Sequence, residues 1–195
     1  MIKKVVALII SIIIINLILE ISCKPEKFHL QITGFNIEVY DRSDRRAIPL
    51  KNGDTTFCDT LKLVTDFQCK KIASVHFSSN TLYAYYDPPP DISEGLSDSV
   101  SNINLNSNEE FQGISKYGSL NNYVLCKVNI ASNNHLISID SLRTFINSWK
   151  GDYLPMCIFY IYKKPNFESL RTFKLVFSFN SGKSIEFETP EFIWL

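Results

Sequence analysis

The chain has few of the residues from which common catalytic and metal-binding motifs are built. Seven glycines occur in 195 residues, and neither Gly-x-Ser-x-Gly nor a glycine-rich phosphate loop is present. The three histidines, His29, His76 and His135, are widely separated, and no Cys-x-x-Cys accompanies them. A nucleophile elbow, a phosphate cradle and a structural zinc site all depend on such spacings. We therefore expect no metal, no cofactor and no enzymatic activity, with a hydrolase as the least favoured alternative.

An excess of charge of one sign is also lacking. Twenty basic and twenty acidic residues give a formal net charge of zero. Because nucleic-acid binding needs a basic patch or stripe, this balance argues against a nucleic-acid partner. Hydrophobic residues make up 45% of the chain and aromatic residues 13%, which is ample material for the core of one domain.

The N-terminus carries the longest apolar run of the sequence. Lys3 and Lys4 precede an apolar stretch from Val5 to Leu19, and Glu20 ends it. The run is about 15 residues, shorter than the roughly 20 that a membrane-spanning helix needs. A basic start, an apolar middle and a small residue before a cleavage point are typical of a secretory signal.

The end of this segment, Ile21-Ser22-Cys23, resembles the lipobox of a bacterial lipoprotein signal peptide. The resemblance implies that Cys23 is the lipid-modified residue and that the protein is attached to a membrane. Glu20 departs from the pattern, because an apolar residue, usually Leu, is expected there. Lys24 follows the cysteine in place of an Asp, which in this family implies attachment to the outer membrane of the cell envelope. An uncleaved signal anchor and a conventional cleaved signal remain alternatives.

This interpretation divides the chain into three parts. Residues 1–22 are expected to be a signal peptide, residues 23–27 a lipidated tether, and residues 28–195 a single domain. Two or more acyl chains on Cys23 would make the attachment stable, because each methylene group buried in the membrane contributes about 0.8 kcal/mol.

Alternating hydrophobicity predicts that this domain is mainly β. The segment from Phe28 to Asp41 alternates, and the alternation changes phase at Gly34, which predicts a bulge. Residues 173–187 alternate on both sides of Asn180-Ser181-Gly182-Lys183, which predicts a hairpin. One amphipathic helix is expected near residues 140–150, with Ser138 or Asp140 at its start and Gly151 at its end. We expect an antiparallel β-sandwich, immunoglobulin-like or transthyretin-like.

The downstream chain also resembles the uncharacterised single-domain lipoproteins common in Bacteroidota. The similar features are PPPDI followed by SVSNINLNSNEEF, the SLRTFINSW helix and the final Phe-rich hairpin. That family has no established catalytic residues, so the resemblance implies a location in the cell envelope but no activity.

Four cysteines remain once Cys23 is set aside. Cys58, Cys69, Cys126 and Cys157 are candidates for disulfides, since their number is even and an exported protein meets oxidising conditions. The sequence does not select a pairing, and buried thiols are the alternative.

Two further groups of residues have side chains suited to binding a ligand or an ion. Tyr83 and Tyr85 share one face of a predicted strand and are candidates for an aromatic ligand face. Four acids near three prolines, Asp87, Asp91, Glu94 and Asp98, lack the spacing of a calcium loop, and we interpret them as solvated. The sequence thus favours a membrane-anchored, non-catalytic binding or structural module. Its partner is another envelope protein, or alternatively a glycan or small ligand.

Overall fold

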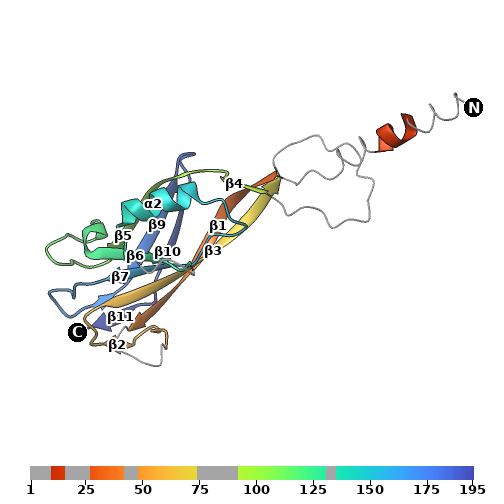
Figure 1. The fold of residues 1–195 in the computed structure, drawn as a ribbon. Coiled ribbons are helices and arrows are strands. Elements are labelled where there is room, and N and C mark those ends of the chain that lie inside the picture. The colour runs from red at the N-terminus through yellow and green to blue at the C-terminus, as the bar shows by residue number, and fades with distance from the viewer. Residues whose placement is uncertain (1–9, 16–26, 42–47, 74–91, 131–134) are drawn as a thin grey trace, which may run out of the picture.

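The protein is mainly β (Figure 1). The computed structural model describes residues 10–15, 27–41, 48–73, 92–130 and 135–195. The elements of the domain are, in chain order, β1 (Lys27–Asp41), β2 (Thr55–Thr56), β3 (Leu61–Ala73), β4 (Ile92–Leu96), β5 (Val100–Ser107), the 3-10 helix η1 (Asn121–Tyr123), β6 (Val124–Val128), α2 (Ile139–Ser148), β7 (Cys157–Ile161), β8 (Leu170–Arg171), β9 (Phe173–Phe179), β10 (Ser184–Glu188) and β11 (Phe192–Trp194).

The strands form two main sheets and one small sheet. The first has the order β4-β1-β3-β7-β6, the second β10-β9-β5, and the small one β2-β11-β8. The predicted antiparallel pairing holds for most neighbours, but β4 pairs with β1, and β2 with β11, in parallel. Parallel neighbours need a long connection, and β4 has one because β3 runs back along β1 before β4 begins.

One hydrophobic core lies between the two main sheets. The inward residues of β9, Phe173, Leu175 and Phe177, are fully buried, and so are Leu61 and Leu63 of β3. Their neighbours in sequence are only partly buried, as the alternation of a strand with one covered face requires.

The structure confirms the predicted bulge and the predicted hairpin. The register of β1 against β3 shifts between Ile32 and Gly34, which is the expected bulge. Strands β9 and β10 form the expected hairpin, with Phe177 opposite Ile185. Its turn includes Gly182, whose φ of 83° is one that residues with a Cβ rarely adopt.

Helix α2 confirms the predicted amphipathic helix. The Oγ of Ser138 accepts a hydrogen bond from the backbone N–H of Ser141, so Ser138 is the N-cap. The helix ends at Ser148, earlier than expected from Gly151. Gly151 instead lies against the indole of Trp149, where a Cβ would approach the ring to 2.7 Å.

Side-chain amides replace a neighbouring strand along the outer edge of β5. Asn147 of α2 accepts from the backbone N–H of Val100 at 2.8 Å and donates to the carbonyl of Val100 at 2.9 Å. Asn121 of η1 accepts from the N–H of Leu105 at 3.1 Å and donates to the carbonyl of Ile103 at 2.8 Å. Each carboxamide thus presents a donor and an acceptor to the strand, as a backbone would.

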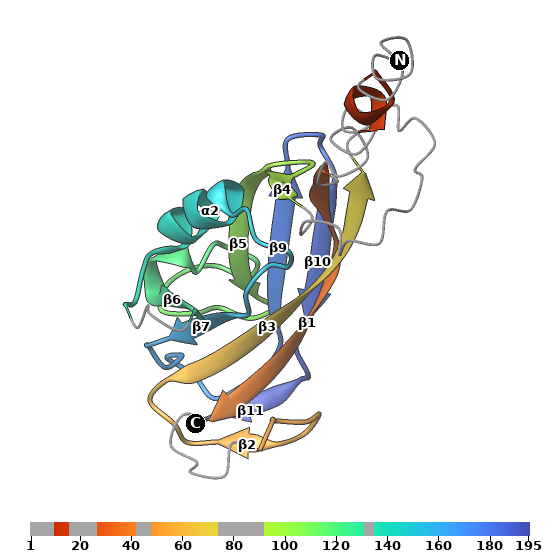
Figure 2. The same cartoon turned by 45° about the vertical axis from the view of Figure 1, so that its right-hand side comes forward.

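Further bonds complete this edge. Arg143 of α2 donates to the carbonyl of Ser101 at 2.9 Å, and the N–H of Leu120 donates to that of Leu105 at 2.7 Å. Helix α2 packs against both β5 and β6, so it covers the place where the two main sheets meet (Figure 2). We call this line along β5 the closed seam. An exposed strand edge would otherwise offer its backbone to other chains.

Candidate functional site

The opposite junction of the two sheets, between β1 and β10, has a different construction. The two strands lie close together (Figure 2), yet among the described residues no backbone hydrogen bond joins them. The N–H of Thr189 bonds the carbonyl of Phe173, and the N–H of Phe179 bonds that of Lys183. Because bonding alternates along a strand, Ser184 and the next alternate residues turn their backbone groups away from β9 and toward β1. We call this junction the open seam.

The path of β4 explains why the open seam exists. β4 pairs with β1 only as far as Leu30, where the N–H of Ser97 donates to the carbonyl of Leu30 at 2.8 Å. The chain then leaves the first sheet and enters the second as β5. The edge of β1 that begins at Gln31 therefore has neither β4 nor β10 as a paired neighbour, until Tyr40 bridges Pro49 near the end of the strand.

Aromatic side chains hold the middle of the open seam together. The ring of Phe35 on β1 lies 5.1 Å from that of Phe177 on β9, in an edge-to-face arrangement. It also lies 6.2 Å from the rings of Phe67 and Phe187. Packing of these rings therefore joins the sheets where hydrogen bonds do not.

Beyond these rings, toward the start of β1, the open seam widens into a pocket of about 480 Å³. This volume is within the range of small-molecule sites in proteins. Three strands and two turns contribute its walls. The lining residues are Gln31, Ile32, Thr33, Asp98, Phe179, Lys183, Ser184 and Ile185.

Backbone bonds fix the wall formed by the β9–β10 turn. The N–H of Ser181 donates to Oδ1 of Asp98 at 3.2 Å, and the N–H of Asn180 donates to the carbonyl of Ser99 at 3.0 Å. Asp98 therefore ties the turn that carries Lys183 to the turn between β4 and β5. Asp98 is partly exposed and therefore in contact with solvent, and its carboxylate also has a structural partner and lines the pocket.

The bulge of β1 fixes the opposite wall. Thr33 donates its hydroxyl proton to the carbonyl of Gln68 at 3.0 Å, which anchors the bulged stretch to β3. Beside Thr33, Ile32 is buried and Gln31 is partly exposed. A rigid backbone on both sides gives the pocket a defined shape, as small-molecule sites usually have.

The lining combines a polar rim with an apolar floor. Lys183 supplies a cation and Asp98 an anion, and Gln31 and Ser184 add an amide and a hydroxyl. Ile32, Phe179 and Ile185 supply apolar surface. Such a set can bind a small polar molecule through several hydrogen bonds and one apolar face.

The cysteines lie elsewhere, and they are thiols in the structure. Cys126 on β6 and Cys157 on β7 are fully buried on neighbouring strands. Burial raises the pKa of Cys157 to about 12, and burial together with the nearby Cys157 raises the pKa of Cys126. Since the thiolate is the reactive form, neither sulfur is activated.

The other two cysteines belong to different surroundings. The thiol of Cys58 is buried 3.3 Å from the hydroxyl of Thr56. Cys69 is partly exposed on β3. Its pKa is raised, chiefly by burial, although a hydrogen bond with the backbone of Leu154 acts in the opposite direction. Disulfides among these residues stay a prediction, to be tested on the protein from its native compartment.

No group of three metal-ligating side chains occurs among the described residues. The Nε2 atom of His29 lies 3.3 Å from the carboxylate of Glu94, which forms an ion pair with Lys27 at 3.1 Å. Glu94 is exposed, so it is a solvated acid as expected, and its contacts also join β4 to β1.

Several residues singled out from the sequence fall outside the described part of the chain, among them His76, Asp87 and Asp91. So do three candidate site residues, the lipidation candidate Cys23 and the aromatic pair Tyr83 and Tyr85. The residues that line the pocket were not predicted as a site. The bulge at Gly34 and the turn at Gly182 each have a local sequence signal, but no pattern indicates that these two places meet in space.

Comparison with known proteins adds no relationship to this description. The chain matches no family model, no curated protein and no solved structure.

Proposed function

We propose that this protein is a membrane-anchored, non-catalytic binding module whose ligand site is the pocket of the open seam. The single observation that carries the binding role is that pocket, with Lys183 and Asp98 on its rim and Ile32 and Phe179 on its floor. Its lining supplies hydrogen-bond donors, acceptors and apolar surface, which are the groups that recognition of a small polar ligand needs.

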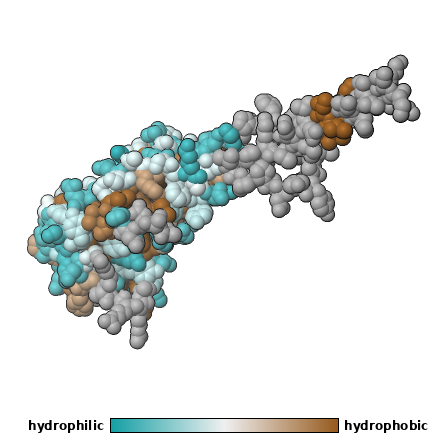
Figure 3. Space-filling view, in the orientation of Figure 1, coloured by the Kyte–Doolittle hydropathy of each residue, from teal (hydrophilic) through white to brown (hydrophobic). Residues whose placement is uncertain are grey.

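The anchoring role rests on the N-terminal segment. The lipobox-like Ile21-Ser22-Cys23 makes Cys23 the attachment point. The described turn of helix at residues 10–15 carries five isoleucines, each between 50% and 55% exposed, which Figure 3 shows as a hydrophobic patch. Exposed apolar surface of this kind is favourable in a membrane or a translocation channel. Among the described residues no helix is long and apolar enough to cross a membrane.

For the domain itself we propose a β-sandwich of immunoglobulin-like or transthyretin-like type. Two main sheets that enclose one core support the sandwich, and the helix over one junction supports a fold that is closed on that side. The location that follows from the lipobox resemblance is the cell envelope, with the outer membrane as the expected site of attachment.

The ligand class that fits the pocket best is a small glycan. Hydroxyl and acetamido groups can donate to Asp98 and Gln31 and accept from Lys183 and Ser184. A sugar ring also has an apolar face, which Phe179 and Ile185 can contact. This proposal moves the expected ligand face from Tyr83 and Tyr85 to the open seam.

An NMR titration of the full chain with an N-acetylated disaccharide tests the proposal. We expect amide shifts confined to Gln31–Thr33 and Lys183–Ile185, and a Kd weakened about tenfold by Lys183→Gln, since a hydrogen bond to a charged group contributes about 1.5–3 kcal/mol. Lys163→Gln, which removes an exposed lysine outside the pocket, is the matched control. Shifts spread evenly over the surface, or equal Kd values for both variants, would refute the glycan site.

A further inference from the structure

The end of the domain from which the tether leaves is a three-stranded ribbon. Here β1 pairs with β3 on one side, Phe28 lying opposite Ala73, and with β4 on the other. The ribbon extends beyond the rest of the fold, and β1 begins at its outer end (Figure 1). We define the ribbon tip as residues 27–31, 70–73 and 92–94.

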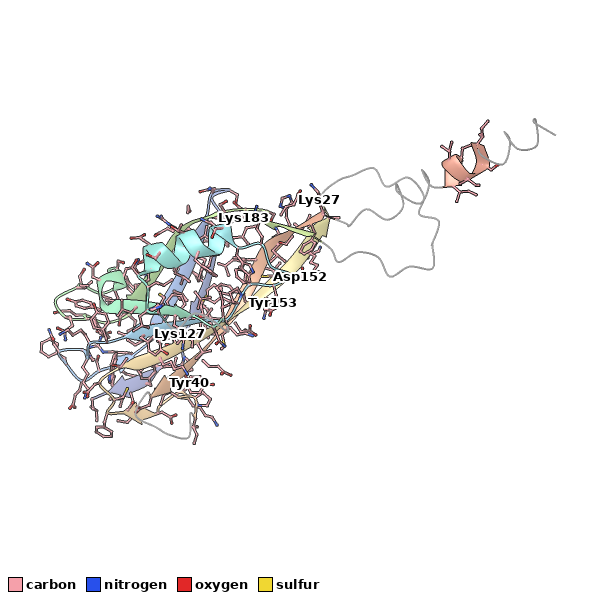
Figure 4. The ribbon with its side chains drawn as sticks, in the orientation of Figure 1. Lys27, Tyr40, Lys127, Asp152, Tyr153 and Lys183 are labelled. Atoms are coloured by element: carbon pink, nitrogen blue, oxygen red, sulfur yellow. The ribbon has the colours of Figure 1, made fainter. Side chains whose placement is uncertain are left out.

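The ribbon tip is basic. Lys27, Lys70 and Lys71 all lie on it and are exposed, and its one described acid is Glu94, which pairs with Lys27 at 3.1 Å, so the described residues leave an excess of two positive charges. Figure 4 labels Lys27 at the outermost end of the ribbon, while Tyr40 marks the far end of the same strand. Hydrophilic residues gather at this end in Figure 3. A chain with no net charge therefore concentrates positive charge where it emerges from the tether.

The ribbon tip also carries apolar surface. Ile72 is 36% exposed and lies opposite His29. The ammonium group of Lys71 is 4.2 Å from the ring centroid of Phe28. An exposed aliphatic side chain among lysines is the composition of a surface that lies at a membrane interface.

The length of the tether decides what this tip faces. Only three residues, Lys24–Glu26, separate Cys23 from Lys27, and they carry one positive and one negative charge. Four residue steps span at most about 14 Å. Since the headgroup region on each side of a bilayer is roughly 5–8 Å thick, a lipidated Cys23 places the start of β1 close to that region.

We propose that the ribbon tip binds the phosphate groups of the lipid headgroups around the anchor, through Lys27, Lys70 and Lys71. The attraction inclines the ribbon onto the bilayer and lets Ile72 enter the interface. Lysines near an anionic surface are attracted to it, and salt screens this attraction. The inference rests on the lipid anchor of the proposed function. It adds that the domain is held in one orientation on the membrane and does not rotate freely about its tether.

Hydrogen exchange on membranes tests the orientation. The full chain, purified with its lipid, is reconstituted into vesicles of phosphatidylcholine, with and without phosphatidylglycerol. We expect amides of Phe28–Leu30 and Lys71–Ala73 to exchange about fivefold more slowly on the vesicles with phosphatidylglycerol at low salt, and equally on both at high salt. The double variant Lys70→Gln/Lys71→Gln should remove the difference.

The matched control is Lys51→Gln/Lys163→Gln, which removes two exposed lysines away from the ribbon tip and should keep the difference. Equal exchange on both kinds of vesicle, or a control that behaves like the tip variant, would overturn the inference. The mass of the Cys23 peptide separates the two proposals. A peptide without acyl chains refutes the anchor and with it the orientation, whereas an acylated peptide with an unprotected tip refutes the orientation alone.

Discussion

The closed seam along β5 and the open seam between β1 and β10 join the same two sheets by different means. Along β5, the side chains of Asn121 and Asn147 take the place of a strand and satisfy the backbone. Between β1 and β10, aromatic packing around Phe35 holds the sheets, and the backbone edges face each other without bonding. The difference matters for function, because the amides occupy the edge of β5, whereas the open seam widens into a pocket beyond the rings.

The largest expected effect is the loss of ring packing in the open seam. Phe35→Ala should lower the free energy of unfolding by about 3–5 kcal/mol, because Phe35 is 4% exposed and its removal leaves a cavity between the sheets. Urea unfolding measures this. Phe57→Ala, at a ring that is 70% exposed, is the control and should cost less than about 0.5 kcal/mol. A cost below about 1 kcal/mol for Phe35→Ala would show that these rings do not hold the seam.

The next effect concerns the amides of the closed seam. Asn121→Ala and Asn147→Ala should each lower the free energy of unfolding by about 2–3 kcal/mol, because each leaves one donor and one acceptor of β5 without a partner. The exposed Asn122, next to Asn121, supplies the control Asn122→Ala. If Asn121→Ala costs no more than Asn122→Ala in urea unfolding, the amides do not substitute for a strand.

A third prediction concerns the interior on the β6–β7 side, which the closed seam adjoins. The pKa of Cys157 is about 12 in the fold, above the value of about 8.5 of an unfolded thiol. A raised pKa means that the unfolded chain releases this proton first, so its stabilising effect is complete below about pH 8.5 and is lost as the pH rises toward 12.

Urea unfolding of wild type and Cys157→Ala at pH 8 and pH 10 measures this loss. The free energy of unfolding of the wild type should fall by about 1–2 kcal/mol more than that of the variant over that interval, because only the wild type carries the Cys157 thiol. An equal loss in both proteins would mean that water reaches Cys157 in the folded state.

The smallest effect on stability is expected in the pocket. Lys183→Gln should change the free energy of unfolding by less than about 0.5 kcal/mol, because Lys183 is an exposed side chain on a turn. A thermal melt beside the disaccharide titration measures both properties on one sample. A loss above about 1 kcal/mol would indicate that Lys183 supports the fold, and that its effect on binding cannot be attributed to contact with a ligand.

Local features of the fold could be predicted from the sequence because their causes are local. The phase change of alternation at Gly34 indicates the bulge, the apolar stripe of Leu142 and Ile146 indicates α2, and the alternation around Gly182 indicates the hairpin. Each depends on residues within one turn or one strand of each other.

The candidate site could not be predicted, because its causes are distant in sequence. Asp98 and Ser181 meet only after β4 has left the edge of β1. The partner of Asn147 is Val100, and nothing in an asparagine at the end of a helix indicates that it will bond a strand edge. Periodicity reports which face of an element is apolar, but not which edges of two sheets will face each other.

Amide hydrogen exchange on the full chain compares the two seams most directly. The account predicts strong protection for the outward amides of β5, at Val100 and Leu105, because Asn147 and Asn121 accept from them. It predicts fast exchange for the outward amides of β10, at Ser184 and Glu186, which face the open seam. Equal protection of the two sets would contradict the account, since β1 and β10 would then be bonded and the pocket between them closed.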